Sequence, residues 1–82
     1  MAKSIYCVEH EELCRLLRQI RKNANLTQAQ LADKIGFPQS FVSKYESGER
    51  RLDLVELRQV CTALNTSVAD FSKRWEKTLN ET

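Results

Sequence analysis

The residues best suited to binding chemistry lie in the segment 39–47, which reads QSFVSKYES. At roughly 100° per residue on a helical wheel, its polar side chains share one arc of about 140°. These polar residues are Gln39, Ser40, Ser43, Lys44 and Ser47, and the apolar residues opposite them are Phe41, Val42 and Tyr45. The polar arc carries amide, hydroxyl and ammonium groups without a carboxylate, which suits contacts to phosphates and base edges in a DNA major groove. A helix side that only faces solvent would show the same pattern, so both interpretations stay open for this segment.

This segment follows another short amphipathic segment, and local signals mark the ends of both. Thr27 and Gln30 have the spacing of a capping box, which predicts a helix over residues 28–35. Pro38 fixes φ near a helical value and lacks an amide hydrogen, so we expect it to open the next helix, over residues 38–46. The chain has only two glycines, and both stand where these helices should stop, at Gly36 and Gly48.

Apolar periodicity predicts three further helices around this pair. Apolar residues recur at steps of three and four up to Ala24, which predicts a helix over about residues 9–24. The spacing of capping residues predicts the starts of two more helices, over residues 54–64 and 67–79. The cap pairs are Asp53 with Glu56 and Ser67 with Asp70, and the residues placed to close helices are Asn25 and Asn65. The apolar stripes of the last two helices are Leu54, Leu57, Val60, Cys61 and Leu64, followed by Val68, Phe71, Trp75 and Leu79.

Length and composition predict one small all-α domain. The 82 residues are 41% apolar and 29% charged, and no strand alternation is visible. We expect an N-terminal arm at residues 1–8, a single five-helix domain at residues 9–79 and a short tail at residues 80–82. No apolar run is long enough to span a bilayer, and the first residues lack the long apolar core of a secretory signal. The expected location is therefore the cytoplasm, without membrane contact.

Charge is unevenly distributed along the chain. The net charge of +2 indicates little by itself. Residues 13–51, however, carry eight Lys or Arg against three acids, a balance of +5, which leaves −3 for the rest of the chain. A basic centre between acidic ends fits a footprint on a polyanion, although clustered surface lysines and arginines are also common.

Cysteine and histidine suggest a rival interpretation. Cys7, His10 and Cys14 are spaced i, i+3 and i+7, so on one continuous helix they would share a face, and Cys61 would supply a fourth zinc ligand. This spacing matches no recognised zinc-finger pattern, and cysteine often serves as a small apolar filler. We therefore expect reduced thiols, no metal and no cofactor. A lone histidine, without a glycine-rich phosphate loop or paired acids, also leaves no catalytic constellation, so we expect no enzyme activity.

The segment LTQAQLADKIGFPQSFVSKYESGERR resembles the signature of the lambda-repressor-like, Cro-type (XRE) helix-turn-helix family. The likeness extends over about residues 13–71 and is most specific at Thr27-Gln28, Leu31-Ala32, Gly36, Val42-Ser43, Tyr45-Glu46 and Gly48. It implies a five-helix lambda-repressor-like domain with the helix-turn-helix in its second and third helices. The implied function is sequence-specific binding of double-stranded DNA as a transcriptional regulator, in a homodimer on a near-palindromic operator.

The resemblance also assigns site residues. Gln39, Ser40, Ser43 and Lys44 correspond to outward positions that contact bases. Gln28 corresponds to a glutamine that touches a phosphate and braces the reading helix, the name used below for the helix expected over residues 38–46. Arg50 and Arg51 follow on the flanking loop and, with Ser47, are assigned to phosphates, although the two arginines could also be a solvated pair.

Two further contacts follow from the resemblance. Glu46 borders the apolar side of its helix, where an unpaired carboxylate costs several kcal/mol. Arg21 matches a family arginine that pairs with it, so we expect an Arg21–Glu46 ion pair.

The last helix often builds a two-fold interface in the family, which assigns Trp75 and Leu79, with Phe71 at the core end of their stripe, to the dimer contact.

Two alternative functions remain. The architecture also resembles restriction-modification controller proteins. A protein-interaction module, such as an antitoxin that binds a toxin partner, belongs to a different class and does not exclude DNA binding.

Overall fold

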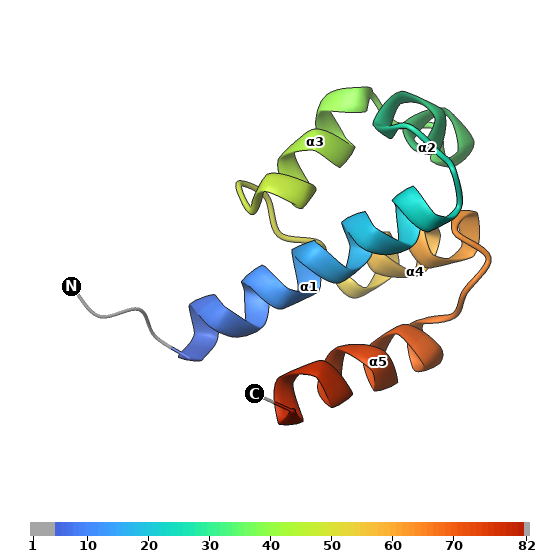
Figure 1. Ribbon diagram of the computed structural model, residues 1–82. Coiled ribbons are helices and arrows are strands. Elements are labelled where there is room, and N and C mark those ends of the chain that lie inside the picture. Colours follow the sequence, from blue (N-terminus) through green and yellow to red (C-terminus); the bar gives the residue numbers. More distant parts are fainter. Residues whose placement is uncertain (1–4, 82) are drawn as a thin grey trace.

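The computed structural model describes residues 5–81, which form five helices and no strand (Figure 1). They are α1 (Ile5–Asn23), α2 (Gln28–Ile35), α3 (Gln39–Ser47), α4 (Leu54–Ala63) and α5 (Val68–Asn80). The predicted all-α, five-helix class is therefore confirmed for this part of the chain. None of these helices is long and apolar enough to cross a membrane.

The predicted caps define most helix ends. Thr27 Oγ1 accepts from Gln30 N at 3.0 Å, and Gln30 Oε1 accepts from Thr27 N at 2.9 Å, which completes the capping box of α2. Asp53 and Glu56 form the same reciprocal pair at the start of α4. Positive φ angles occur at the residues expected to close helices, which are Asn25, Gly36, Gly48 and Asn65. Local sequence thus fixes these boundaries.

The start of the first helix differs most from the prediction, and the other helix ends agree with it within one residue. The first helix begins at Ile5 and not near Glu9, so residues 5–8 are helical and the arm assigned to 1–8 is wrong there; residues 1–4 lie outside the described part. Trp75 Nε1 donates to Glu9 O at 3.0 Å, which joins this half of the helix to α5. Pro38 precedes α3 as its N-cap, with ψ at 153°, and the helix proper starts at Gln39.

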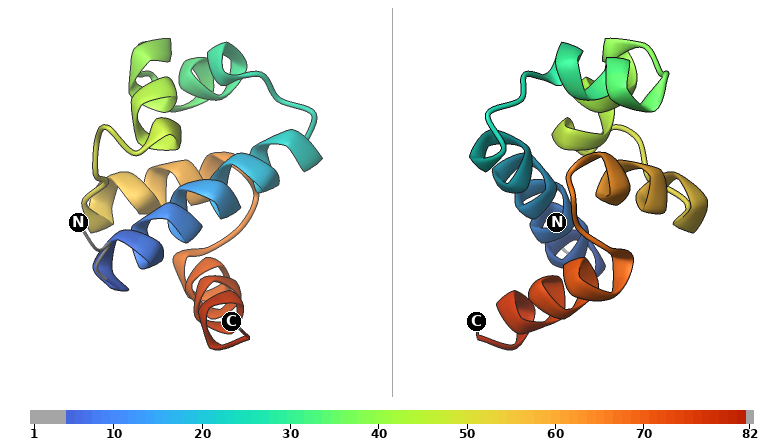
Figure 2. Two further views of the ribbon diagram at one scale, coloured as in Figure 1. Left: turned by 60° about the vertical axis from the view of Figure 1, so that its left-hand side comes forward. Right: turned by 90° about the vertical axis from the view of Figure 1, so that its right-hand side faces the viewer.

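Helix α1 runs through the middle of the molecule (Figures 1 and 2). It packs against α3 on one side and α5 on the other, while α4 packs against α2 and α5. The α2–α3 pair and α5 thus lie on opposite sides of α1 in all views. The largest fully buried side chains, contributed by all five helices, are Leu17, Leu31, Val42, Tyr45, Val60, Cys61 and Phe71.

One predicted core position is wrong. Leu54 was placed in the apolar stripe of α4, but its side chain is 70% exposed, and the neighbouring Val55 is 69% exposed. The stripe that reaches the core begins at Leu57 and continues through Val60 and Leu64. The side chains of the first turn of α4 that point away from the core are therefore left exposed.

Candidate nucleic-acid interface

The polar arc of α3 faces solvent. Phe41, Val42 and Tyr45 are 7%, 0% and 1% exposed, whereas all five polar residues of the arc are exposed. Among the side chains that the structure describes, four of these make no hydrogen bond or ion pair, namely Gln39, Ser40, Ser43 and Lys44. Their donors and acceptors are therefore available to a ligand.

Aromatic packing holds the opposite side of α3 in place. The Phe37 and Phe41 ring centroids are 4.4 Å apart, and those of Phe41 and Tyr45 are 5.5 Å apart in an edge-on arrangement. Burial, together with the neighbouring Glu46 carboxylate, raises the pKa of Tyr45 above its ordinary value, so the phenol stays neutral inside the core. These contacts fix the rotation of the helix and hence the direction of its polar arc.

A buried ion pair joins α3 to α1. Arg21 Nε and Nη2 donate to the two Glu46 carboxylate oxygens at 2.7 and 3.0 Å, and the two side chains are 8% and 4% exposed. Arg21 Nη1 also donates to Leu26 O at 2.8 Å. Gln28 Nε2 donates to Glu46 Oε1 at 3.0 Å, so the first residue of α2 joins the same cluster. The structure thus contains the expected Arg21–Glu46 pair and shows Gln28 bracing α3 through it.

The loop after α3 holds the two arginines in different settings. Arg50 donates to both Glu56 carboxylate oxygens at 2.9 and 2.6 Å and lies 4.8 Å above the Phe41 ring centre. This ion pair lowers the pKa of Glu56 to about 2. Arg51 is exposed and lines a small hollow with Leu13 and Trp75. The structural role of Arg50 was not foreseen, because nothing in the sequence indicated that Glu56 would face it.

Two other residues border the C-terminal end of α3. Ser47 Oγ donates to Lys44 O at 3.0 Å and accepts from Glu49 N at 3.4 Å, so a phosphate contact would share this hydroxyl with the helix end. Arg18 of α1 lines a hollow of about 190 Å³ together with Ser47 and Gly48. In the sequence Arg18 contributes only to the total charge, since its place beside α3 depends on how α1 packs.

The thiols of Cys14 and Cys61 lie in the hydrophobic core. Cys14 and Cys61 are 5% and 0% exposed, and burial raises the pKa of Cys14 and raises that of Cys61 to about 11. Cys14 Sγ lies 3.7 Å from His10 Nε2. The side chain of Cys7 lies outside the described residues, and no cluster of three metal-binding side chains occurs among those described. Both described thiols therefore have the environment of apolar filler and not of reactive thiolates.

The residues assigned to the dimer contact divide into two groups. Phe71 is 1% exposed and packs inside its own chain, so it offers no surface to a partner and its assignment to the interface is wrong. Trp75 is half-buried, and its indole nitrogen bonds to α1. Leu79 is also half-buried and lines a hollow beside Trp75.

An outward polar helix braced across a turn by a second short helix defines a helix-turn-helix domain. The helix-turn-helix family model HTH_3 matches residues 17–71, which is more than half of the chain. An XRE-family like protein from Pseudomonas syringae pv. tomato superposes with a TM-score of 0.84 and 38% identity, covering 90% of each chain. The chain belongs to the XRE family of helix-turn-helix proteins.

Two further relatives are informative. The chain is 40% identical over 67 residues to the cryptic phage CTXphi transcriptional repressor RstR of Vibrio cholerae serotype O1, covering 82% of this chain. It spans 59% of the length of that relative. The restriction-modification controller protein C.Esp1396I, solved as a tetramer with its natural 35 base-pair operator, superposes with a TM-score of 0.79 over 92% of this chain and 95% of its own. At 23% identity that likeness concerns the fold.

Proposed function

We propose that this protein binds double-stranded DNA sequence-specifically and regulates transcription, with α3 in the major groove. One observation carries the proposal: α3 presents Gln39, Ser40, Ser43 and Lys44 to solvent without partners in the described chain, while its other side is locked into the core. A rigid helix with free donors and acceptors is what direct readout of base edges requires. The repressor that is 40% identical supports this function.

The exposed side chains suggest a division of roles. The Gln39 amide can pair bidentately with adenine, the Lys44 ammonium can donate to guanine O6 and N7, and the hydroxyls of Ser40 and Ser43 suit either base type. Phosphate contacts belong to groups at the margins of α3, where they position the protein without reading sequence. These groups are Gln28, Ser47, Arg50 and Arg51.

The functional unit that we propose is a homodimer in the cytoplasm on a near-palindromic operator. Two-fold symmetry presents two copies of α3 to equivalent half-sites on one face of the duplex. Binding over a promoter represses transcription, whereas a position that contacts polymerase activates it. The structurally similar controller protein C.Esp1396I, solved as a tetramer with its operator, supports binding by more than one copy.

The base-reading role of Lys44 can be tested directly. Duplexes selected from random DNA supply the specific site, and affinities for this site and for a random duplex are then measured across salt concentrations. Lys44→Ala should relax specificity at one position per half-site by about 1–3 kcal/mol. Arg51→Ala, the matched control, should weaken both duplexes alike and reduce the salt slope by about one. Equal losses on both duplexes for Lys44→Ala would contradict base reading.

A further inference from the structure

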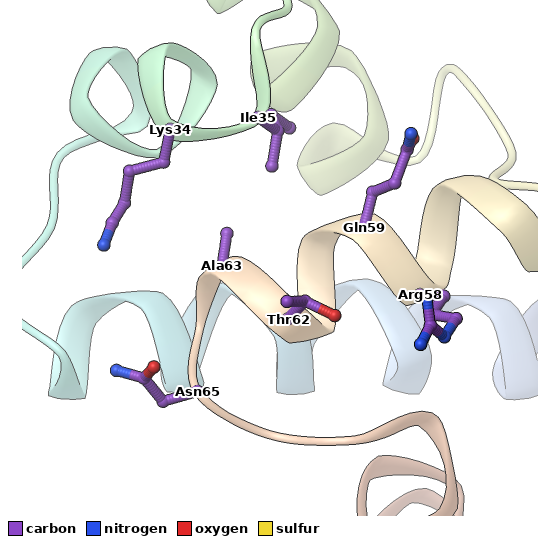
Figure 3. A pocket seen from close by; sticks show the side chains of 7 residues that line it. All are labelled: Lys34, Ile35, Arg58, Gln59, Thr62, Ala63 and Asn65. Carbon is purple, nitrogen blue, oxygen red and sulfur yellow. The ribbon is translucent and has the colours of Figure 1, made fainter.

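A groove of about 430 Å³ lies between α2 and α4 and opens to solvent (Figure 3). Ile35 of α2 and Ala63 of α4 are half-buried and point toward each other across it, so the bottom of the groove is apolar. Its polar lining residues are Lys34, Arg58, Gln59, Thr62 and Asn65. Among the described residues, none of these five side chains makes a hydrogen bond or an ion pair, so all are available to a ligand.

The charge of this α2–α4 groove is positive. Its lining includes two exposed cations, Lys34 on α2 and Arg58 on α4, and no acid. The one acid within α4, Glu56, already accepts hydrogen bonds from Arg50 at 2.6 and 2.9 Å. Free cations beside an apolar surface attract carboxylates, and a guanidinium can bind a carboxylate through two parallel hydrogen bonds. The groove therefore suits an acidic ligand that also has apolar groups.

The apolar surface continues along α4 beyond the groove. Leu54 and Val55 are 70% and 69% exposed. Each lies four residues before a residue of the groove wall, and side chains at this spacing are neighbours on a helix. Residues 54–63 extend about 14 Å along the helix axis at 1.5 Å per residue. An open surface of this length cannot enclose a small molecule, but it can support several turns of another helix.

We propose that the α2–α4 groove binds an acidic amphipathic helix of a partner protein. Apolar side chains of this helix cover Leu54, Val55 and the bottom of the groove, while its Asp or Glu side chains pair with Lys34 and Arg58. The apolar anchors of such a helix recur at i, i+3 and i+4 and supply affinity. The ion pairs fix its orientation and select it over neutral or basic helices.

The groove is separate from the proposed DNA-reading surface. Its lining includes no residue of α3, so contacts made by the polar arc do not use it. Phosphates offer no apolar surface to cover Leu54 and Val55, whereas an amphipathic helix offers both apolar and acidic groups. The inference therefore does not depend on the proposed DNA-binding function.

Peptide selection tests whether the protein prefers such helices. A random peptide library displayed on phage is selected against the immobilised full chain, and the affinities of the enriched peptides are measured by fluorescence anisotropy. These peptides should combine Asp or Glu with apolar residues at i, i+3 and i+4, and they should bind more weakly as salt concentration rises. Enrichment of no peptide, or of basic peptides, would overturn the inference.

Two variants that remove equal charge locate the bound peptides. Lys34→Gln/Arg58→Gln removes two exposed cations from the groove, and Lys73→Gln/Arg74→Gln removes two exposed cations from α5. The groove variant should bind the enriched peptides at least tenfold more weakly, whereas the α5 variant should stay within twofold of wild type. Urea midpoints close to that of wild type would confirm that both variants fold. Equal peptide affinities for the two variants would overturn the groove as the binding site.

A third variant tests the apolar part of the surface. Leu54→Ser/Val55→Ser changes only exposed side chains, so it should fold, and it should weaken the enriched peptides at least threefold. Unchanged affinity would overturn the alignment of the partner helix along α4.

DNA titrations distinguish a protein site from an extension of the DNA-binding surface. The groove variant and the α5 variant should bind a selected duplex with affinities within twofold of each other. A tenfold loss in the groove variant alone would place the groove in the DNA footprint and overturn the inference. If wild type bound no specific DNA, the proposed function would fail, and the peptide affinities would still decide the role of the groove.

Discussion

At the scale of single residues, Glu46 connects three helices. It receives Arg21 from α1 and Gln28 from α2 while it belongs to α3, and its side chain is 4% exposed. A carboxylate buried to this extent is tolerated because each of its oxygens accepts a charge-assisted hydrogen bond. The orientation of the reading helix therefore depends on a side chain that need not touch DNA.

Replacing Arg21 with Met should expose this dependence. The variant leaves the Glu46 carboxylate buried without its cation, which should cost about 3–5 kcal/mol of unfolding free energy in urea denaturation. Specific DNA affinity, measured below the lower melting temperature, should fall as well. The double variant Arg21→Met/Glu46→Leu removes both charges and should regain much of the stability. An unchanged denaturation midpoint in the single variant would show that the pair contributes nothing.

The Arg50–Glu56 pair predicts a pH dependence. Arg50 lowers the pKa of Glu56 from 4.5 to about 2 in the folded chain, so ionised Glu56 stabilises the fold above the unfolded-state pKa. That contribution should be lost as pH falls from about 5 to about 2. Glu56→Gln keeps a capping side chain but removes the charge, so its melting temperature should lie below wild type at pH 7.

The test compares the two melting curves across this pH range. The gap between wild type and Glu56→Gln should narrow as pH falls through the unfolded-state pKa and close only below pH 2, where the carboxyl group is protonated in both folded and unfolded chains. A gap of constant size from pH 6 to pH 2 would mean that the charge of Glu56 is irrelevant to stability.

At the scale of helices, local sequence accounts for boundaries where a cap or a left-handed residue is decisive. Thr27 and Asp53 predict the starts of α2 and α4, because their side chains accept hydrogen bonds from backbone N–H groups of the same helix. Gly36 predicts the end of α2, because it adopts the left-handed conformation there. The start of α1 and the exposure of Leu54 were predicted wrongly. The exposure of Leu54 depends on which helix lies alongside, and this is set by the packing of distant segments.

The contacts of the candidate site also divide into those that the sequence predicts and those that depend on tertiary packing. The outward arc of α3 could be predicted from periodicity alone, because burial follows the helical wheel. The Arg21–Glu46 pair was expected from the family resemblance. The Arg50–Glu56 pair, the position of Arg18 and the exposed apolar turn of α4 required the structure, since each joins or separates residues through tertiary geometry.

Gly36→Ala tests the turn between the two helices of the motif. Gly36 has a φ of 76°, and a Cβ built there meets nothing within 4 Å, so the cost is conformational and not a clash. The variant should lose roughly 1–2 kcal/mol of stability in urea unfolding, with an unchanged slope. Ser43→Ala, at an exposed helical position, is the control and should change stability little. Equal stability of Gly36→Ala and wild type would show that the turn relaxes out of the left-handed region.

At the scale of the whole molecule, a small domain gains specificity by acting in pairs. One copy offers four outward side chains on α3, which can read only a few base pairs. A second copy held by symmetry doubles the contacts without adding a new binding surface.

A rigid pair should be sensitive to the spacing of its half-sites. Inserting five base pairs between the half-sites of a selected operator turns one of them by about half a turn onto the opposite face of the duplex. The two copies could then no longer touch, so affinity should fall at least tenfold to that of independent half-sites. Inserting ten base pairs restores the face but adds about 34 Å, which exceeds the reach of a direct contact between the two copies and should also abolish cooperativity. Electrophoretic mobility titrations on the three duplexes measure both effects. If the ten-base-pair insertion kept full cooperativity, the two copies would have to be joined by something more flexible than a direct contact between folded domains.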